Sequence, residues 1–125
     1  YGKINKCAFF GLPGNPVSVI VTFNLFVNAA INKLCGKNYE NHLLLEAELI
    51  DDIKKRKGRT EYKRGILINK DNKLYVKKSG AQGSNILSSL KDANCYIKLD
   101  SEIDNLKKGM KVKVMPLTLS SKYYE

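Results

Sequence analysis

The spacing of apolar residues changes near residue 41, and this change limits the fold more than any other feature of the sequence. Over residues 16–35, apolar side chains recur every three or four positions, as on one face of an α-helix. Beyond residue 41 they alternate with polar side chains, as in strands with one buried face. In the clearest case, Met110, Val112 and Val114 alternate with lysines. The sequence therefore predicts a helical segment followed by a β-rich one.

The first third of the chain is predicted to be a strand, a rigid loop and a helix. Residues 6–10, KCAFF, have the composition of a short buried strand. Asn15 is a favoured N-cap residue, Pro16 suits the first helical position, and Gly36 suits the position after the last turn. Because one strand and one helix cannot bury both of their faces, residues 1–40 are interpreted as a remnant of an α/β unit.

Short strands follow one another through the rest of the chain. The alternation predicts them at residues 43–50, 60–69, 73–77, 94–99 and 110–115. Asp71-Asn72 and Lys108-Gly109 are turn signals. Residues 79–92 interrupt the series with a Gly- and Ser-rich loop that ends in one or two helical turns. We therefore expect a small, mostly antiparallel β-barrel-like domain over residues 41–117 and a flexible tail over residues 118–125.

Cysteine and histidine usage argues against a disulfide framework or a metal site. Cys7, Cys35 and Cys95 are odd in number and far apart, which predicts reduced, buried thiols in a cytosolic protein. The single histidine, His42, has polar neighbours and is interpreted as a solvated linker residue. No run is judged long or apolar enough to span a bilayer, and no leader pattern is found. We therefore expect a cytoplasmic protein without a membrane segment.

The chain is strongly basic, with a formal net charge of +10 from 22 Lys and Arg against 12 Asp and Glu. Such a charge suits a polyanionic partner such as nucleic acid. It also follows from a sequence rich in Lys, Asn and Ile throughout, and its one tight basic cluster covers only residues 54–59. Charge alone leaves both interpretations open.

Residues 11–18, GLPGNPVS, are the first candidate for chemistry. A glycine-containing turn that opens a helix presents backbone N–H groups and the positive end of the helix dipole, which together suit an oxyanion. Pro13 and Pro16 stiffen the turn, while Asn15 and Ser18 add side-chain donors. The alternative is a capped helix behind a stiff loop. The stretch is not a Walker P-loop, because it lacks the lysine and the glycine spacing of that motif.

Two further segments carry groups suited to oxyanions. In residues 58–65, GRTEYKRG, a strand would place Arg59 and Lys63 on one face and Arg64 on the other, and arginine forks bind phosphate-like oxygens. Ser84 lies in a Gly-Ser loop ahead of a predicted short helix. The alternatives are a solvated basic strand and a capped turn. No nucleophile–His–acid set is found, so the catalytic residues are unknown.

Taken in order, three motifs resemble one family. They are GLPGNPVS at the start of a helix, GRTEYKRG at the start of a strand, and SGAQGSNILSSLKDAN ahead of the strand CYIKL. Together they look like the C-terminal end of a molybdopterin molybdenumtransferase, of the molybdenum insertase family that includes the E domain of gephyrin. The resemblance covers nearly the whole chain, from about residue 2 to residue 117.

The resemblance implies a molybdopterin-binding α/β subdomain for residues 1–40 and the family's small C-terminal barrel-like subdomain after it. It implies a cytoplasmic, homodimeric enzyme that inserts molybdenum from molybdate into adenylylated molybdopterin, releasing AMP with the help of a divalent metal such as Mg²⁺. Its substrate contacts carry over to Pro13, Gly14, Asn15, Pro16, Ser18, Arg59, Arg64 and Ser84. The family's acidic stretch is absent, so this chain alone is expected to be inactive.

Two other classes of function stay open at this point. A basic barrel could bind nucleic acid by stacking bases on aromatic side chains, but Tyr62, Tyr75 and Tyr96 fall on different predicted strands. Members of the resembled family also serve as protein-binding platforms, and nothing in the sequence excludes such a role. Nucleic acid is the less favoured partner.

Overall fold

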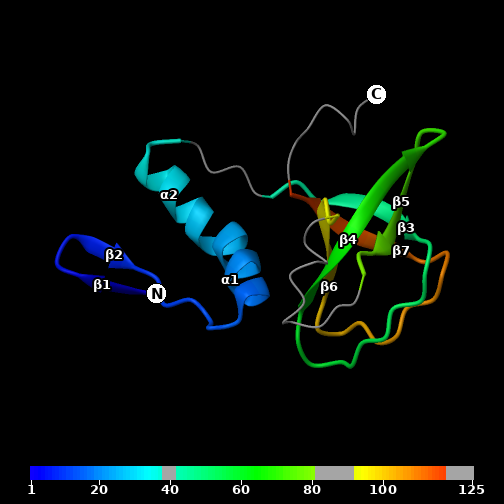
Figure 1. Cartoon of the computed structure of the whole chain (residues 1–125), viewed down its shortest axis with the longest axis horizontal. Coiled ribbons are helices and arrows are strands. Elements are labelled where there is room, and N and C mark those ends of the chain that lie inside the picture. The colour runs from blue at the N-terminus through cyan, green and yellow to red at the C-terminus, as the bar shows by residue number, and fades with distance from the viewer. Residues whose placement is uncertain (38–41, 81–91, 118–125) are drawn as a thin grey trace. The chain divides into compact units, whose positions relative to one another are not determined.

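The computed structural model of the chain describes residues 1–37, 42–80 and 92–117. These residues divide into two compact units, one made of residues 1–37 and the other of residues 42–80 and 92–117 (Figure 1). Each unit is described by itself. Most of the predicted linker, most of the Gly- and Ser-rich loop with its helical turns, and the predicted tail lie outside the described residues.

The first unit begins with an antiparallel hairpin of β1 (Gly2–Ile4) and β2 (Cys7–Phe9). Asn5 turns the chain with a φ of 53°, a left-handed conformation that asparagine tolerates better than most residues. The strand predicted over residues 6–10 is confirmed as β2, but its predicted burial is wrong, since all of β2 is exposed. The sequence gives no signal for β1, because three residues are too few for an alternation to stand out.

One continuous helical stretch follows, formed by α1 (Pro16–Thr22), the π-helical segment η1 (Phe23–Val27) and α2 (Asn28–Leu34). It confirms the helix predicted over residues 16–35. Gly36 ends it with a φ of 72°, the left-handed conformation that favours glycine after the last turn. The π-helical turn could not be foreseen, because one slightly wider turn barely shifts a period of about 3.6 residues.

The helix from Pro16 to Leu34 is long and apolar enough to cross a membrane, judged by length and composition alone. The sequence-based judgement that no run meets this test is therefore wrong. Its polar interruptions are uncharged Asn, Ser and Thr side chains, and Lys33 is its one charged residue. Only 6% of the helix is buried within the described chain. Core helices of soluble proteins and leader sequences share this composition, so the finding assigns no membrane role.

The second unit is a closed barrel of five strands (Figure 1). In chain order they are β3 (Leu45–Leu49), β4 (Glu61–Lys70), β5 (Lys73–Lys78), β6 (Cys95–Leu99) and β7 (Lys111–Pro116). Around the barrel the order is β3-β5-β4-β6-β7, and every neighbouring pair is antiparallel except β3 with β5. The predicted fold class is confirmed: a strand, loop and helix precede a small, mostly antiparallel barrel.

Two of the barrel's turns are the ones that the sequence signals. Asp71 and Asn72, which join β4 to β5, have φ values of 51° and 58°. Positive φ at both central residues matches the twist of a two-residue hairpin, which explains the choice of Asp and Asn. Gly109, with a φ of 86°, turns the chain into β7. These turns fix where the alternation of each strand begins.

The barrel interior holds one apolar core, to which every strand contributes. Gly65 of β4 lies against it, because an added Cβ would come within 2.9 Å of Ile97 and 3.0 Å of both Cys95 and Val76. The wall at this point has room only for glycine. The buried core residues are Ala47, Leu49, Ile53, Leu67, Val76, Cys95, Ile97, Leu99, Leu106, Val112 and Val114.

Asn94 extends the pairing between β4 and β6 with its side chain. Its Oδ1 accepts from the Leu67 N–H at 2.7 Å, and its Nδ2 donates to the Leu67 carbonyl at 3.0 Å. Its own N–H donates to the Gly65 carbonyl, and its carbonyl accepts from the Leu117 N–H. One residue therefore ties β4 to the end of β7.

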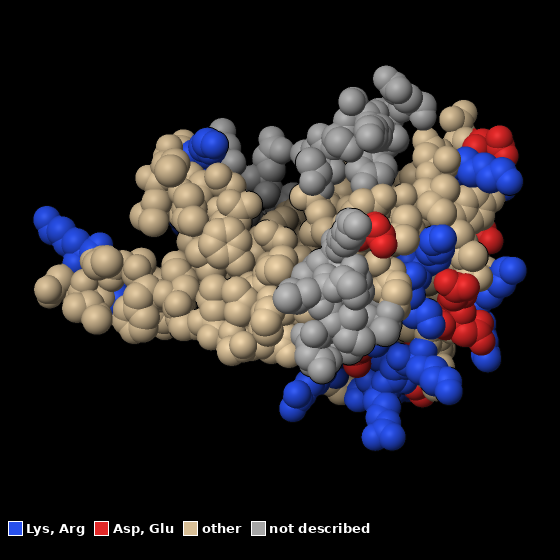
Figure 2. All heavy atoms as spheres, viewed as in Figure 1, with Lys and Arg blue, Asp and Glu red and all other residues tan. Residues whose placement is uncertain are grey.

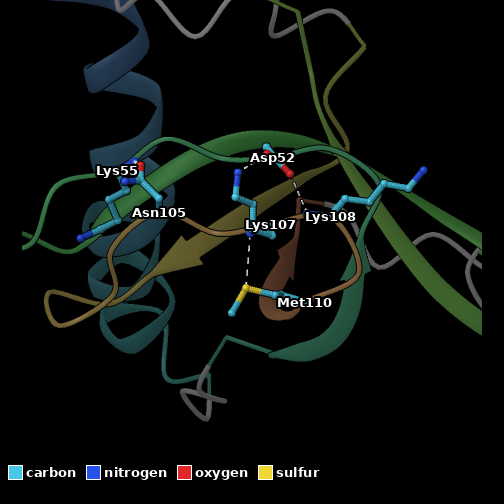
Figure 3. A network of polar contacts seen from close by, with 6 residues as sticks. All are labelled: Asp52, Lys55, Asn105, Lys107, Lys108 and Met110. Atoms are coloured by element: carbon cyan, nitrogen blue, oxygen red, sulfur yellow. Dashed lines mark hydrogen bonds and ion pairs between the residues drawn. The ribbon is translucent and has the colours of Figure 1, made fainter.

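A polar clamp closes one end of the barrel, where the loop after β3 meets the loop before β7 (Figure 3). Ile53 and Leu106 exchange two backbone hydrogen bonds of 2.9 Å. The Asp52 carboxylate accepts from the Lys108 N–H at 2.8 Å and from Lys107 Nζ at 2.9 Å. These two donors, the backbone one first, lower the pKa of Asp52 below its usual range. Asp52, interpreted from sequence as surface charge, therefore also anchors a loop.

Lys55 turns into the same end of the barrel and is buried. Its Nζ donates to the carbonyls of Arg56 and Ile103 at 3.0 Å each, and its backbone N–H donates to Asn105 Oδ1 at 3.1 Å (Figure 3). The basic cluster of residues 54–59 is thus not one continuous cationic surface, because this lysine is engaged inside.

The three thiols are free, as predicted, but only one of them is buried. Cys95 lies in the barrel core, where burial raises the pKa of its thiol to about 12. Cys7 and Cys35 are exposed, so their predicted burial is wrong. Both belong to the first unit, whose apolar residues find few partners within the described chain.

Candidate oxyanion-binding site

The start of the helix is fully capped by Asn15. Its Oδ1 accepts from the N–H groups of Val17 at 3.1 Å and Ser18 at 3.3 Å, and its carbonyl accepts from Val19 at 2.9 Å. Pro16, the first helical residue, has no N–H. No backbone N–H of the first turn is therefore free, which contradicts the expectation that this helix end would offer them to an anion.

The donors that remain belong to the loop and to two side chains. Because Asn15 caps the helix through Oδ1, its Nδ2 amino group is left to donate elsewhere. Among the described residues, none accepts a hydrogen bond from this group or from the N–H groups of Gly14 and Asn15. The Ser18 hydroxyl, one turn along, is partly exposed. Asn15 therefore joins a structural role to an available N–H donor, which aspartate at the same position would not provide.

The glycines of the loop are not explained by backbone strain or by packing. Gly11 and Gly14 are exposed, and neither has a positive φ. An added Cβ at either position would meet nothing within 4 Å among the described residues. Pro13 is exposed as well. The loop therefore presents an open, stiff surface to which another group can approach closely.

Arg59 lies outside the strand in which the sequence placed it. β4 begins at Glu61, and the chain turns just before at Gly58, which has a φ of 119°. Arg59 is exposed, whereas Lys63 forms a 2.8 Å ion pair with Glu61. The expectation that Arg59 and Lys63 share one strand face is therefore wrong, and Arg59 is a loop cation.

Arg64 is in β4 as predicted, but it is buried, with only 4% of its surface exposed. Gly65 next to it faces the interior, so alternation directs Arg64 to the outer face of the barrel. Loss of hydration is the main cause that lowers the pKa of its guanidinium, and the charge of neighbouring Tyr96 partly offsets it. The alternative of a solvated basic strand does not describe this residue.

Sequence reasoning missed the residues beside Arg64. Tyr96 of β6 pairs with Arg64, and Met115 of β7 pairs with Tyr96, so the three form one row across the outer face. Tyr96 has no exposed surface and Met115 only 4%. A signal was present: the unbroken apolar run of residues 95–97 is typical of a strand covered on both faces.

The structure groups some of the predicted site residues and leaves others apart. Asn15, Pro16 and Ser18 lie together in one turn of the first unit, with Pro13 and Gly14 in the loop before it. Arg59 and Arg64 belong to the second unit. Ser84 lies outside the described residues. In the described part of the chain, no group of three or more His, Cys, Asp or Glu side chains could hold a metal ion.

The architecture defines a class of protein: a small closed β-barrel domain preceded by a hairpin, a stiff loop and a helix. A solved molybdopterin biosynthesis moeA protein from Pyrococcus horikoshii superposes with a TM-score of 0.66 and 34% identity, over 82% of this chain and 26% of that one. A molybdenum cofactor biosynthesis protein from Pyrococcus furiosus gives a TM-score of 0.64 and 33% identity, over 82% of this chain and 36% of that one. Residues 46–117 match the MoeA C-terminal region, domain IV. The chain belongs to this family.

Sequence relatives agree with the structural ones. A molybdopterin molybdenumtransferase from Haemophilus influenzae is 37% identical over 93% of this chain and 29% of its own length. Gephyrin from Dictyostelium discoideum is 43% identical over 85% of this chain and 16% of its own length. The chain therefore spans less than a third of the length of each of these two relatives.

Proposed function

We propose that this chain acts as the C-terminal part of a molybdopterin molybdenumtransferase. In that reaction, molybdenum from molybdate enters adenylylated molybdopterin and AMP is released. The chain is proposed to supply oxyanion contacts and to be inactive alone, because it spans only 29% of the length of the molybdenumtransferase it resembles. Family membership and the similarity to the molybdopterin molybdenumtransferase of Haemophilus influenzae support the proposal.

The observation that carries the proposal is the double use of Asn15. Its Oδ1 satisfies the helix start, which leaves Nδ2 as a fixed donor next to the open surface of Gly14. Amide N–H donors held in place in this way bind oxyanions without paying for their own ordering. Ser18 adds a hydroxyl on the same turn. Pro13 and Pro16 contribute stiffness, since neither has an N–H to donate.

The arginines are proposed, by the resemblance, as further residues that contact molybdate or the phosphate of the pterin. Arg59, an exposed loop cation, can reach toward an anion, whereas Arg64 is held rigid by burial in β4. A guanidinium remains charged even when its pKa is lowered, so Arg64 offers a fixed positive charge. Ser84 is proposed as a further hydroxyl donor.

The wider assignments are proposals of the same kind. Residues 1–40 would belong to the molybdopterin-binding subdomain and residues 41–117 to the barrel, with residues 118–125 as a tail. The whole protein is proposed to be a cytoplasmic homodimer that uses Mg²⁺. The described residues do not fit a Mg²⁺ site, because they include no suitable cluster of carboxylates, and no step of the reaction is assigned to the metal here.

No observation favours the alternative of a nucleic-acid-binding barrel. Tyr96 is fully buried and cannot stack on a base. On the face shown in Figure 2, Lys and Arg side chains gather on the barrel unit, but Asp and Glu side chains are interspersed among them. Among the described residues of this unit, Lys63, Lys98, Lys107 and Lys111 form ion pairs with carboxylates.

An amide NMR titration of the full chain with molybdate tests the proposal, with sulfate and single-stranded DNA as controls. We expect the largest shifts at Gly14, Ser18 and the Asn15 side-chain amide, with molybdate displacing sulfate. Equal, weak shifts for both anions at lysines throughout the chain would overturn it. A strong, salt-dependent response to DNA would favour the nucleic-acid alternative instead.

A further inference from the structure

Two neighbouring strands of the barrel, β3 and β5, meet at a seam that is only partly paired. β3 and β5 pair at just two positions, Glu48 with Tyr75 and Leu49 with Val76. Both strands extend further upstream, β3 to Leu45 and β5 to Lys73. The other edge of β3 is fully used, because it pairs with β7 along four residues. The upstream halves of β3 and β5 therefore diverge and leave a gap between two strand edges.

A hollow of about 370 Å³ occupies this gap. Buried Ala47 and half-buried Leu74 give it an apolar floor. Four outward-facing side chains form its rim, namely Glu46, Glu48, Lys73 and Lys111. The volume lies at the small end of the range for ligand pockets, about 300–1,000 Å³.

Backbone groups of β3 point into the hollow. Leu49 bonds to the residues just before β7, its N–H to the Met110 carbonyl and its carbonyl to the Gly109 N–H, whereas the Ile50 N–H donates to the Val76 carbonyl of β5. The backbone N–H and carbonyl groups of successive residues point to opposite edges of a strand. Those of the even-numbered residues of β3 therefore point toward β5. Glu46 thus directs its N–H and carbonyl across the gap, at a level where the described β5 gives it no ladder partner.

The charges on the rim are unequally paired. Lys111 forms a 2.6 Å ion pair with Glu46. Within the described part of the chain, no ion pair involves Lys73 or Glu48. If the β3–β5 register continued upstream, Lys73 would lie opposite Glu46, whose charge is already matched. An acidic group that enters beside Lys73 would therefore meet an unmatched positive charge, whereas Glu48, also without an ion pair in the described chain, lies where β3 and β5 are still paired.

We propose that this seam, bounded by Glu46 and Ala47 on one side and Lys73 and Leu74 on the other, binds an extended acidic peptide as an added strand. The peptide backbone pairs with the open edge at Glu46, as in other complexes where a strand joins a sheet edge. A small apolar side chain faces Ala47, and an Asp or Glu side chain on the next residue meets Lys73. This surface is distinct from the oxyanion contacts proposed above.

Titration of the ¹⁵N-labelled full chain with the peptide Ac-Thr-Val-Asp-Val-Thr-NH₂, in which the apolar residues flank the Asp, tests the proposal. We expect amide shifts confined to Glu46, Ala47, Lys73 and Leu74. The Lys73→Glu variant should bind this peptide about three- to fivefold more weakly, the size of effect expected for one exposed ion pair. Lys57→Glu, which makes the same charge change at an exposed site in another loop, should bind it unchanged.

A backbone-methylated version of the peptide separates strand pairing from charge attraction. Methylation of alternate amides keeps the charge and removes the ladder donors, so we expect it to abolish the localised shifts. Equal binding of the methylated peptide, equal weakening by Lys57→Glu, or an absence of shifts at the seam would each overturn the proposal. Occupation of the seam by a second copy of the chain would also overturn it. That outcome would appear as a dimer in light scattering and as seam shifts that depend on protein concentration.

Discussion

Replacing Asn15 separates the structural role of this side chain from its proposed role in binding. Its Oδ1 holds the Val17 and Ser18 N–H groups, and its Nδ2 is the proposed oxyanion donor. Asn15→Asp keeps an acceptor oxygen at the helix start and removes the donor. Asn15→Ala removes both. Comparing the two variants therefore shows whether Asn15 only caps the helix or also binds the anion.

The size of the structural effect follows from the capping geometry. Loss of an N-cap side chain to alanine costs about 0.5–2 kcal/mol. At about 1 kcal/mol, the amides of Val17 and Ser18 should exchange with solvent about fivefold faster in Asn15→Ala. In Asn15→Asp both bonds persist, and the negative charge at the positive end of the helix dipole adds about 0.3–1 kcal/mol. Protection in this variant should equal or exceed that of the natural sequence.

Amide hydrogen exchange and molybdate titration of the same samples read the two roles separately. We expect both variants to bind molybdate more weakly. In Asn15→Asp the affinity should fall about tenfold, because the carboxylate repels the anion and the N–H donor is lost. Asn28→Asp, which makes the same change at an exposed position of the same helix, is the control. Wild-type affinity in Asn15→Asp would refute the donor role, and faster exchange of Val17 in that variant would refute the cap.

Three further predictions concern the barrel. Gly65→Ala should lower the free energy of unfolding by about 1–3 kcal/mol, because its Cβ would overlap three core side chains; an unchanged urea midpoint would contradict this. Cys95 should resist iodoacetamide in the folded chain while the two exposed thiols react, so native mass spectra should show two additions and unfolded ones three. Folding lowers the pKa of Asp52 below its reference value of 3.8. The ionised carboxylate therefore stabilises the fold fully at a pH above 3.8, and this contribution is lost as the pH falls through the lowered pKa. In Asp52→Asn, the free energy of unfolding should therefore fall less steeply as the pH is lowered. An unchanged fall at low pH would show that the hydrogen bonds of Asp52 do not cause it.

The barrel strands could be predicted because their signals are local. Alternation along β7 and the two-residue turn at Asp71-Asn72 each depend on a few neighbouring residues. The closing pair, β3 with β5, joins distant segments in parallel and leaves no such local sign. Asn94 is similar, since its side chain matters only through Leu67, which lies far away in the sequence.

Burial was predicted less well than secondary structure, and for one physical reason. An apolar residue shows that a face can be covered, but not whether a partner is present in the same chain. β2 and the helix of residues 16–34 are apolar and largely exposed within the described chain, whereas Arg64 is charged and buried. For Tyr96 the sequence did hold a clue, because its apolar neighbours on both sides break the alternation of a half-exposed strand.

The stiff loop before the helix acquires a specific meaning from the cap. Two prolines remove N–H groups at positions 13 and 16, and Asn15 occupies those of positions 17 and 18. Beyond Pro13, what this stretch can still donate is confined to the N–H groups of Gly14 and Asn15, the Asn15 side-chain amide and the Ser18 hydroxyl. A loop needed only to start a helix would gain nothing from such confinement, since any Ser, Thr or Asp cap would serve. A loop that must present few donors in fixed directions to a small tetrahedral anion would require it.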